Sequence, residues 1–210
     1  MPERIVQEEA ITGIDRARNY AEGQKKYARL LFGPLLKDVK TLNLGENYLE
    51  IGAGPGLLAI AIAEDNPHVH ITAVDISSDM VTVANEYIRA NRLQDIIQYY
   101  MADANDEDNL SRLGKFDLVY TTFSMHHWKE PVKSISNLWN AVKNDGTLYI
   151  YDFKSDSWLS YLPLSGGDKD SIRASYSTSE VRVMLQKSGI TNYRIKTPFP
   201  FVFQSVIARK

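Results

Sequence analysis

The chain has 210 residues, of which 44% are apolar and 24% are charged. This length and balance predict one globular domain that folds alone, and they exclude a disordered chain. The net charge of −2 gives no field that would attract a polyanion, so no nucleic-acid partner is expected. Cysteine is absent, which excludes thiolate nucleophiles, disulfides and thiolate metal sites.

No stretch approaches the roughly 20 apolar residues that span a bilayer. The segment MPERIVQEEAITGIDRARNY has no apolar core of the kind found in a signal peptide. A cytoplasmic protein with no membrane partner is therefore expected.

The first predicted element is an amphipathic helix over Asp15 to Leu36. Apolar residues recur there at three- and four-residue spacings, and Pro34 is expected to end the helix. This helix belongs to an N-terminal helical cap that covers residues 1–44.

Short apolar strands alternate with helices over residues 45–153, the predicted core. The predicted strands are 48–51, 70–75, 97–102, 116–122 and 147–153, and the predicted helices are 57–63, 80–91 and 131–142. Ser77 or Ser78 caps the second of these helices, and Asn144-Asp145-Gly146 forms the turn before the last strand. Connections this short imply a mostly parallel sheet that is covered on both faces.

The rhythm breaks at residues 154–176, which are predicted to be an irregular insertion with one helical turn. Ser177 and Glu180 then have the spacing of a capping box, and Gly189 closes the helix that they open. Two neighbouring strands, 193–197 and 201–208, give an antiparallel finish to the segment 177–210. The prediction is thus a single domain over residues 1–210.

A glycine cluster lies where the first strand turns into a helix, in the segment Glu50-Ile51-Gly52-Ala53-Gly54-Pro55-Gly56. Three glycines in five residues let the main chain pass close to a ligand, although a plain tight turn is the alternative. Asp75 ends the next strand at the spacing expected of a carboxylate that accepts both hydroxyls of a ribose, or it caps a helix. Asp103 follows the third strand, where a carboxylate could accept from the exocyclic amine of an adenine.

Together these motifs resemble the class I S-adenosylmethionine-dependent methyltransferases over about residues 45–155. The matching segments are LEIGAGPG, VDIS, MADA and FDLVYTTFSMHHW, which leads into PVKSISNLWNAVKNDGTLYIYDF. The resemblance implies a three-layer αβα Rossmann-like sandwich whose seven-stranded, mostly parallel sheet has an antiparallel last strand. It also implies S-adenosyl-L-methionine as the cofactor and methyl transfer to an acceptor by in-line displacement.

The resemblance implies a role for each matched position. Gly52, Ala53 and Gly54 approach the methionine moiety, Glu50 orients the loop and the amino group, and Asp75 holds the ribose. The other implied cofactor contacts are Gly56 in the same loop, Ile76 and Met80 beside the adenine, Ala102, Asp103 and Ala104 at the third strand, Thr121, Thr122 and Phe123 near the transferred methyl, and Tyr20 and Tyr27 on the leading helix. Simple packing of that helix is the alternative for the two tyrosines and is slightly favoured.

His126 and His127 follow the fourth strand and are the nearest candidates for a base, which a hydroxyl or protonated amine acceptor would need. The favoured interpretation is that the pair packs or caps in its own turn, so the catalytic residue is left unassigned. Adjacent side chains diverge and no HxxxH spacing accompanies them, so no metal site is expected. No Asn-Pro-Pro-Tyr type sequence follows the fourth strand, which disfavours exocyclic amine and amide acceptors and favours a small molecule.

Three aromatic side chains and a leucine of the insertion, Trp158, Tyr161, Tyr176 and Leu162, could line a lid over an acceptor, form a homodimer contact or pack at the core edge. Two rival functions stay open. An NAD-dependent oxidoreductase is disfavoured, because the dinucleotide pattern places its third glycine where this chain has Leu57. A non-catalytic, cofactor-binding scaffold is the other alternative, because a fold does not prescribe a function.

Overall fold

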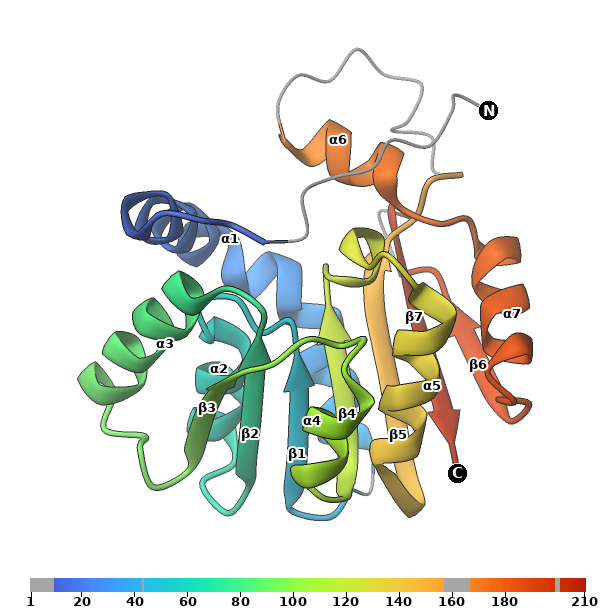
Figure 1. Cartoon of the computed structure of the whole chain (residues 1–210), viewed down its shortest axis with the longest axis horizontal. Helices are drawn as coiled ribbons and strands as arrows, with labels where there is room; N and C mark the ends of the chain where they lie inside the picture. Colours follow the sequence, from blue (N-terminus) through green and yellow to red (C-terminus); the bar gives the residue numbers. More distant parts are fainter. Residues whose placement is uncertain (1–9, 43, 157–166, 199–200) are drawn as a thin grey trace.

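The computed structural model describes residues 10–42, 44–156, 167–198 and 201–210 (Figure 1). The elements in chain order are α1 (Ile14–Thr41), β1 (Asn47–Ile51), α2 (Leu57–Asp65), β2 (His70–Asp75), α3 (Ser78–Ala90), β3 (Ile97–Met101), α4 (Glu107–Arg112), β4 (Phe116–Thr122), the 3-10 turn η1 (Met125–His127), α5 (Pro131–Ala141), β5 (Val142–Phe153), α6 (Gly167–Ala174), α7 (Thr178–Lys187), β6 (Tyr193–Lys196) and β7 (Phe203–Arg209).

The seven strands form one sheet in the order β3-β2-β1-β4-β5-β7-β6. The pairs from β3 to β5 are parallel, whereas β7 runs antiparallel to both of its neighbours. The expected fold class is therefore confirmed. Because β1 lies between β2 and β4, the order of the strands reverses beside it, and the carboxyl end of β1 borders the crevice in which open α/β sheets bind ligands.

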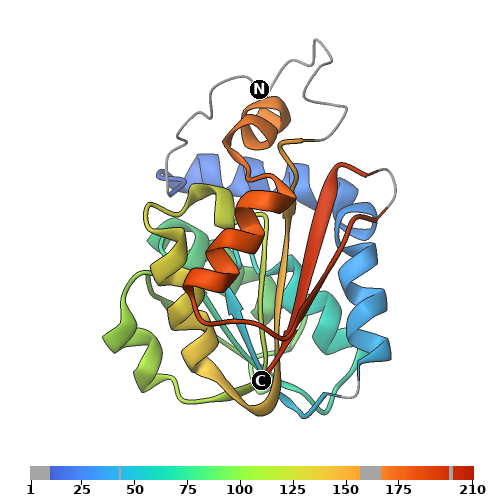
Figure 2. The same ribbon diagram turned by 90° about the vertical axis from the view of Figure 1, so that its right-hand side faces the viewer.

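Helices cover both faces of the sheet (Figure 2). On one face the core is formed with side chains from α1, α2 and α3, and on the other with side chains from α4, α5 and α7. Successive residues of β4 alternate between them, with Tyr120 on the first face and Val119 on the second. Both faces of the sheet are buried beneath helices, which explains why the strands appear in the sequence as nearly continuous apolar runs.

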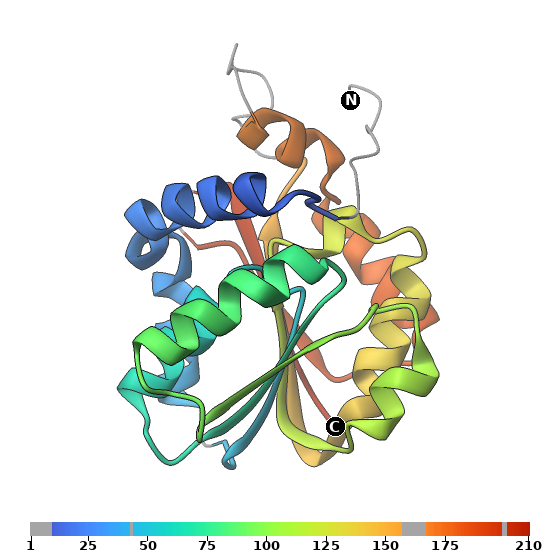
Figure 3. The same cartoon turned by 60° about the vertical axis from the view of Figure 1, so that its left-hand side comes forward.

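The leading helix is longer than predicted. It continues through Pro34 and ends at Thr41, so the expected end at Pro34 is wrong. Proline has no N–H to donate to the preceding turn, and it bends a helix when other contacts hold the helix together. Figure 3 shows that α1 changes direction along its length, with its first half lying beyond the carboxyl ends of the strands.

Tertiary contacts hold the second half of α1 on the sheet. Phe32 and Leu35 are buried in the core of that face. Asp38 accepts a hydrogen bond from the hydroxyl of Tyr149 at 2.8 Å and one from Nζ of Lys196 at 2.7 Å. These contacts outweigh the propensity of Pro34 to end a helix.

The start of β5 differs from the prediction as well. The predicted turn 144–146 lies inside β5, which begins at Val142 rather than Thr147. Phe116 pairs with Val142 and Leu118 pairs with Thr147, so the intervening residues bulge out of the ladder. Asp145, at φ 64°, makes the bend that the sequence located.

Three further differences concern shorter segments. Helix α4 was not predicted; it is only six residues long and is capped by the side chain of Asp106. Helix α6 has eight residues instead of the single turn expected in the insertion. Strand β7 begins at Phe203, because Phe201 has a positive φ of 67° and lies in the turn.

The structure describes one of the four insertion residues for which a lid, a homodimer contact or core packing was considered. Trp158, Tyr161 and Leu162 lie outside the described residues. Tyr176 is buried and packs in the core of the α5 face, which is the packing role considered for it. Helix α6 contacts η1, and Figure 1 shows α6 beyond the carboxyl ends of β4 and β5.

The capping box of α7 gives a test of the fold. The hydroxyl of Ser177 accepts from N of Glu180 at 3.3 Å, and the carboxylate of Glu180 accepts from N of Ser177 at 2.7 Å. We expect Ser177→Ala to lower the free energy of unfolding by about 1 kcal/mol, because a buried helix end loses its cap. Urea unfolding measures this, with the exposed Ser111→Ala as a control that should change by less than about 0.5 kcal/mol.

Candidate functional site

The glycine loop between β1 and α2 adopts a backbone that only glycine accepts easily. Gly52, Gly54 and Gly56 have φ values of 67°, 54° and 74°. A Cβ on Gly52 would overlap Oγ of Ser124, so contact with Ser124 excludes a side chain at Gly52. A Cβ on Gly54 would meet no heavy atom within 4 Å. The main chain at Gly54 therefore borders open space, where a ligand can lie directly against it.

Three side chains fasten this loop to the ends of neighbouring strands. Asp75 accepts from N of Gly54 at 2.8 Å. The hydroxyl of Tyr99 donates to O of Gly54 at 2.6 Å, and that of Ser124 donates to O of Gly52 at 3.1 Å. Sequence reasoning missed Tyr99 and Ser124, since no local spacing connects them to the loop.

Glu50 is the most deeply buried acid of the site, with 1% of its surface exposed. It lies on β1 just before the loop and accepts a hydrogen bond from the hydroxyl of Tyr120 at 3.0 Å. Burial raises the pKa of Glu50 to about 8, and the charge of Asp75 acts in the same direction, whereas the bond from Tyr120 opposes it. A cation bound beside Glu50 would favour its ionised form.

Asp75 is engaged at both oxygens but keeps accepting capacity. Its second oxygen accepts from N of Ser77 at 2.9 Å, and the side chain that caps α3 is that of Ser77. Burial raises the pKa of Asp75, and the N–H groups of Ser77, Gly54 and Ile76 oppose that shift. A carboxylate has about four lone-pair sites, so Asp75 can accept from Gly54 and Ser77 and still bind hydroxyl groups.

Strand register brings the predicted acids to the carboxyl ends of the parallel strands. Asp75 pairs with Met101 at the carboxyl ends of β2 and β3, and N of Ala102 donates to the backbone O of Asp75 at 3.0 Å. Asp103 follows and accepts from N of Asn105 at 2.8 Å. Asp103 is thus held at the same end of the sheet as the glycine loop, one strand beyond Asp75.

The apolar residues predicted around an adenine differ in exposure. Ile76 is partly exposed, whereas Met80 and Ala104 are 3% and 6% exposed. Met80 packs with Ala17 of α1 in a small apolar cluster between α1 and α3. Ala104 packs on the opposite face, in the core beside α5.

The residues predicted near the transferred methyl follow the end of β4. Thr121 and Thr122 are buried, and Oγ1 of Thr121 has no hydrogen-bond partner among the described residues. Phe123 has a positive φ of 52°, which is uncommon for a bulky residue. Its ring contacts the rings of Tyr151 and Phe153, with centroids 5.3 and 5.0 Å away.

The two tyrosines on α1 lie outside the core of the protein. Tyr20 is 43% exposed and Tyr27 is 62% exposed, so neither is part of the core. Tyr20 accepts from Nε2 of Gln24 at 3.3 Å. Both tyrosines lie on the half of α1 that passes near α3.

The two histidines lie in η1, directly after β4. His126 is 3% exposed, and its Nδ1 lies 2.7 Å from Oδ1 of Asp152 on β5. The ring of His127 lies 4.1 Å from that of His126, centroid to centroid. The sequence analysis did not single out Asp152, whose pairing depends on β4 and β5 being neighbours.

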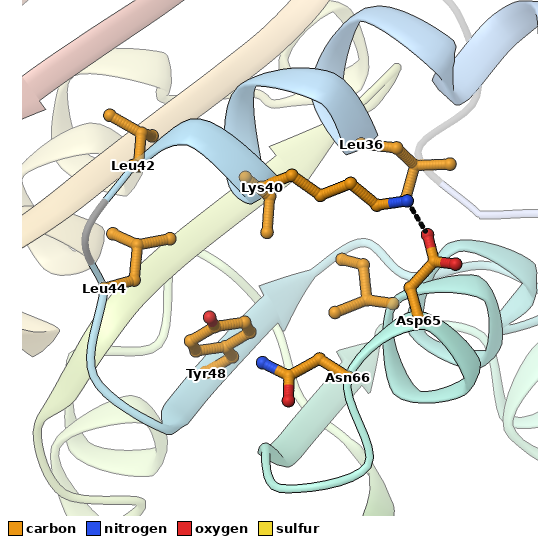
Figure 4. Close-up of a pocket in the computed structure, with 9 residues that line it drawn as sticks. Leu36, Lys40, Leu42, Leu44, Tyr48, Asp65 and Asn66 are labelled. Carbon is orange, nitrogen blue, oxygen red and sulfur yellow. Dashed lines mark ion pairs between the residues drawn. The ribbon is translucent and has the colours of Figure 1, made fainter.

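A cavity of about 290 Å³ lies elsewhere, between the second half of α1 and α2 (Figure 4). Its lining combines apolar residues, including Leu36, Ile62 and Tyr48, with the 2.9 Å ion pair between Lys40 and Asp65. Tyr48 is near the start of β1, so this cavity is at the end of the sheet opposite to the glycine loop.

Among the described residues, no helix combines the length and the apolar character needed to cross a membrane.

Comparison with known proteins agrees with this geometry. Residues 49–148 match a family model described as a methyltransferase domain. The malonyl-[acyl-carrier protein] O-methyltransferase of Priestia megaterium is 28% identical over 134 residues, which cover 64% of this chain and 46% of that protein. The ubiquinone biosynthesis O-methyltransferase of Glaesserella parasuis is 27% identical over 107 residues, which cover 50% and 44%.

A solved structure gives the same fold. A SAM-dependent methyltransferase from Aquifex aeolicus superposes with a TM-score of 0.74 at 20% identity, covering 95% of this chain and 99% of that one. The chain spans less than half the length of the curated relatives that it matches. Residues 49–148, just under half of the chain, thus match the methyltransferase domain family, and the fold is that of SAM-dependent methyltransferases, whose cofactor is S-adenosyl-L-methionine.

The raised pKa of Glu50 predicts a dependence of stability on pH. A carboxyl group whose pKa rises on folding contributes stability that is present below its unfolded pKa, near 4.5, and is lost as the pH rises through about 8. Glutamine cannot ionise, so only the parent loses this stability as the pH rises. We therefore expect the difference in unfolding free energy between Glu50→Gln and the parent to shift in favour of the variant by on the order of 4 kcal/mol from pH 4.5 to above pH 8. Urea unfolding at several pH values measures the difference, and a difference that does not vary with pH would contradict the assignment.

Proposed function

We propose that this chain transfers a methyl group from S-adenosyl-L-methionine to a small-molecule acceptor. The observation that carries the proposal is the main chain at Gly54, which has left-handed geometry and borders open space. Glu50 precedes this loop, and Asp75 binds it directly. A cationic ligand with hydroxyl groups fits such a site.

The donor and acceptor groups of the site suit this cofactor in chemical character. Glu50 is desolvated, so ion pairing with an ammonium group would stabilise its charged form. Asp75 retains lone pairs for ribose hydroxyls, and Asp103 can accept from an amine. When bound, the cofactor supplies a methyl group activated by its sulfonium centre. The chain then has to hold both reactants in line and keep water out.

Most of the proposed cofactor contacts lie at or just after the carboxyl ends of β1, β2, β3 and β4. Glu50, Gly52, Ala53, Gly54 and Gly56 would hold the methionine part, and Asp75 the ribose. The further contacts proposed are Ile76, Met80, Ala102, Asp103 and Ala104 around the adenine, Thr121, Thr122 and Phe123 near the methyl group, and Tyr20 and Tyr27 from α1. The exposure of Tyr27 supports its part in this proposal, because its ring is not enclosed in the core.

The names of two relatives support an oxygen atom as the methyl acceptor. One relative is an O-methyltransferase for malonyl-[acyl-carrier protein], and the other is an O-methyltransferase of ubiquinone biosynthesis. A non-catalytic scaffold that binds the cofactor is the alternative function.

Calorimetric titration with S-adenosylhomocysteine tests the proposal, with NADH as the control ligand at the same concentration. We expect micromolar binding of S-adenosylhomocysteine and no heat from NADH. Binding of NADH alone would favour an oxidoreductase, and binding of neither would remove the cofactor site.

Gly54→Ala separates the ligand role of the loop from its folding role. A Cβ at Gly54 would project into the space assigned to the cofactor, so we expect affinity for S-adenosylhomocysteine to fall at least about tenfold. Gly189→Ala is the matched control, because Gly189 also has positive φ (73°) with nothing within 4 Å, at the end of α7.

Both variants should lose about 1–2 kcal/mol of unfolding free energy from left-handed strain. Only Gly54→Ala should lose affinity. Equal affinities in the two variants would show that the ligand does not lie against Gly54.

A further inference from the structure

Asp152 and His126 form a buried pair that the cofactor site does not use. Both side chains are 1% exposed. Oδ1 of Asp152 lies 2.7 Å from Nδ1 of His126, and Oδ2 accepts from the backbone N of His126 at 3.1 Å. Oδ1 also accepts from N of Phe153 at 2.7 Å. The carboxylate is thus fixed by three contacts, and it in turn fixes the imidazole.

This geometry determines which ring nitrogen carries hydrogen. An ionised carboxylate only accepts hydrogen bonds, so Nδ1 of His126 must donate to Asp152. In the neutral ring, Nε2 then has a lone pair. Nε2 is buried and has no hydrogen-bond partner among the described residues. A buried polar atom without a partner is costly and calls for a functional explanation.

Contacts of neighbouring residues connect η1 with the glycine loop and with Phe123, which is proposed to lie near the transferred methyl group. Ser124, two residues before His126, contacts the backbone of Gly52 in the glycine loop. The ring of Phe153 lies 5.9 Å from that of His126, centroid to centroid, and packs against Phe123. The imidazole is therefore next to aromatic side chains on one side.

We propose that His126 is the general base for an aromatic acceptor with a hydroxyl group, and that Asp152 is the residue that positions it. This inference rests on the proposed function and adds the class of acceptor. The aryl ring would contact Phe123 and Phe153, and its hydroxyl would donate to Nε2 of His126. Helix α6 packs on η1, so the acceptor must pass α6 to reach this atom.

The proposed step balances in atoms and charge. The hydroxyl oxygen forms a bond to the methyl carbon as the carbon–sulfur bond breaks, and that electron pair stays on sulfur. The hydroxyl proton moves to Nε2 of His126 and later to solvent. Asp152 stabilises the imidazolium and stays ionised, the role that an aspartate takes in catalytic triads.

Nitrogen-15 spectra of the imidazole groups test the proposal without an acceptor assay. In the complex with S-adenosylhomocysteine at pH 8, we expect His126 to show hydrogen on Nδ1 and none on Nε2. Added phenol should shift the Nε2 signal, whereas toluene, which lacks the hydroxyl, should not. A hydrogen on Nε2, or no response to phenol, would overturn the proposal.

Two variants separate this role from a purely structural one. In His126→Asn the amide nitrogen replaces Nδ1, so the bond to Asp152 is kept while Nε2 is removed. We expect phenol affinity to fall at least tenfold and affinity for S-adenosylhomocysteine to stay within twofold. Unchanged phenol affinity would overturn the proposal. The exposed His70→Gln, at the opposite end of β2, is the control for both affinities.

Asp152→Asn should change the tautomer of His126, because an amide can present a donor to Nδ1. We expect hydrogen to appear on Nε2 in the spectrum and phenol affinity to fall with it. An unchanged tautomer would overturn the positioning role. If this variant does not fold, the parent spectrum and His126→Asn decide the question. Failure of S-adenosylhomocysteine to bind the parent would instead refute the proposed function.

Discussion

The carboxylate of Asp75 connects the parts on which the site depends. One oxygen accepts from Gly54 in the loop after β1, and the other accepts from Ser77 at the start of α3. The hydroxyl of Ser77 in turn caps α3 at Met80 and donates to O of Ile11 before α1. One partly buried acid thus joins the glycine loop, β2 and the start of α3, and Ser77 extends this connection to the leading segment. Its position follows from β1 and β2 being parallel neighbours.

The candidate site concentrates features that would be unfavourable elsewhere in a fold. The loop holds three residues in left-handed geometry, Phe123 adds a fourth nearby, and Glu50 is a carboxyl group with almost no access to water. Hydrogen bonds from neighbouring side chains stabilise these unfavourable conformations and charges, such as the bond from Tyr120 to Glu50 and the bond from Tyr99 to Gly54. Such clustering is typical of sites that are organised before their ligand binds.

Sequence patterns located the features that depend on local chemistry. Glycines at Gly52 to Gly56, the capping box at Ser177 and the strand that ends at Asp75 all have short-range signals, and the structure has each element in its predicted place. Tyr99 and Asp152 act through contacts between strands, so their partners were invisible until the strand order was known. Pro34 misled because the packing of α1 on the sheet outweighed a local preference. The roles of the site residues toward a ligand stay predictions.

The bend in α1 divides this helix into two parts with different local stability. The first part is attached to α3 by exposed polar contacts, such as the 2.9 Å pair of Arg18 and Glu86, and by a small apolar cluster. The second part is anchored by buried side chains and by Asp38. Salt screens exposed charges far more than it weakens apolar burial. Backbone amides before the bend should therefore exchange with solvent faster than those after it, and increasingly so as ionic strength rises.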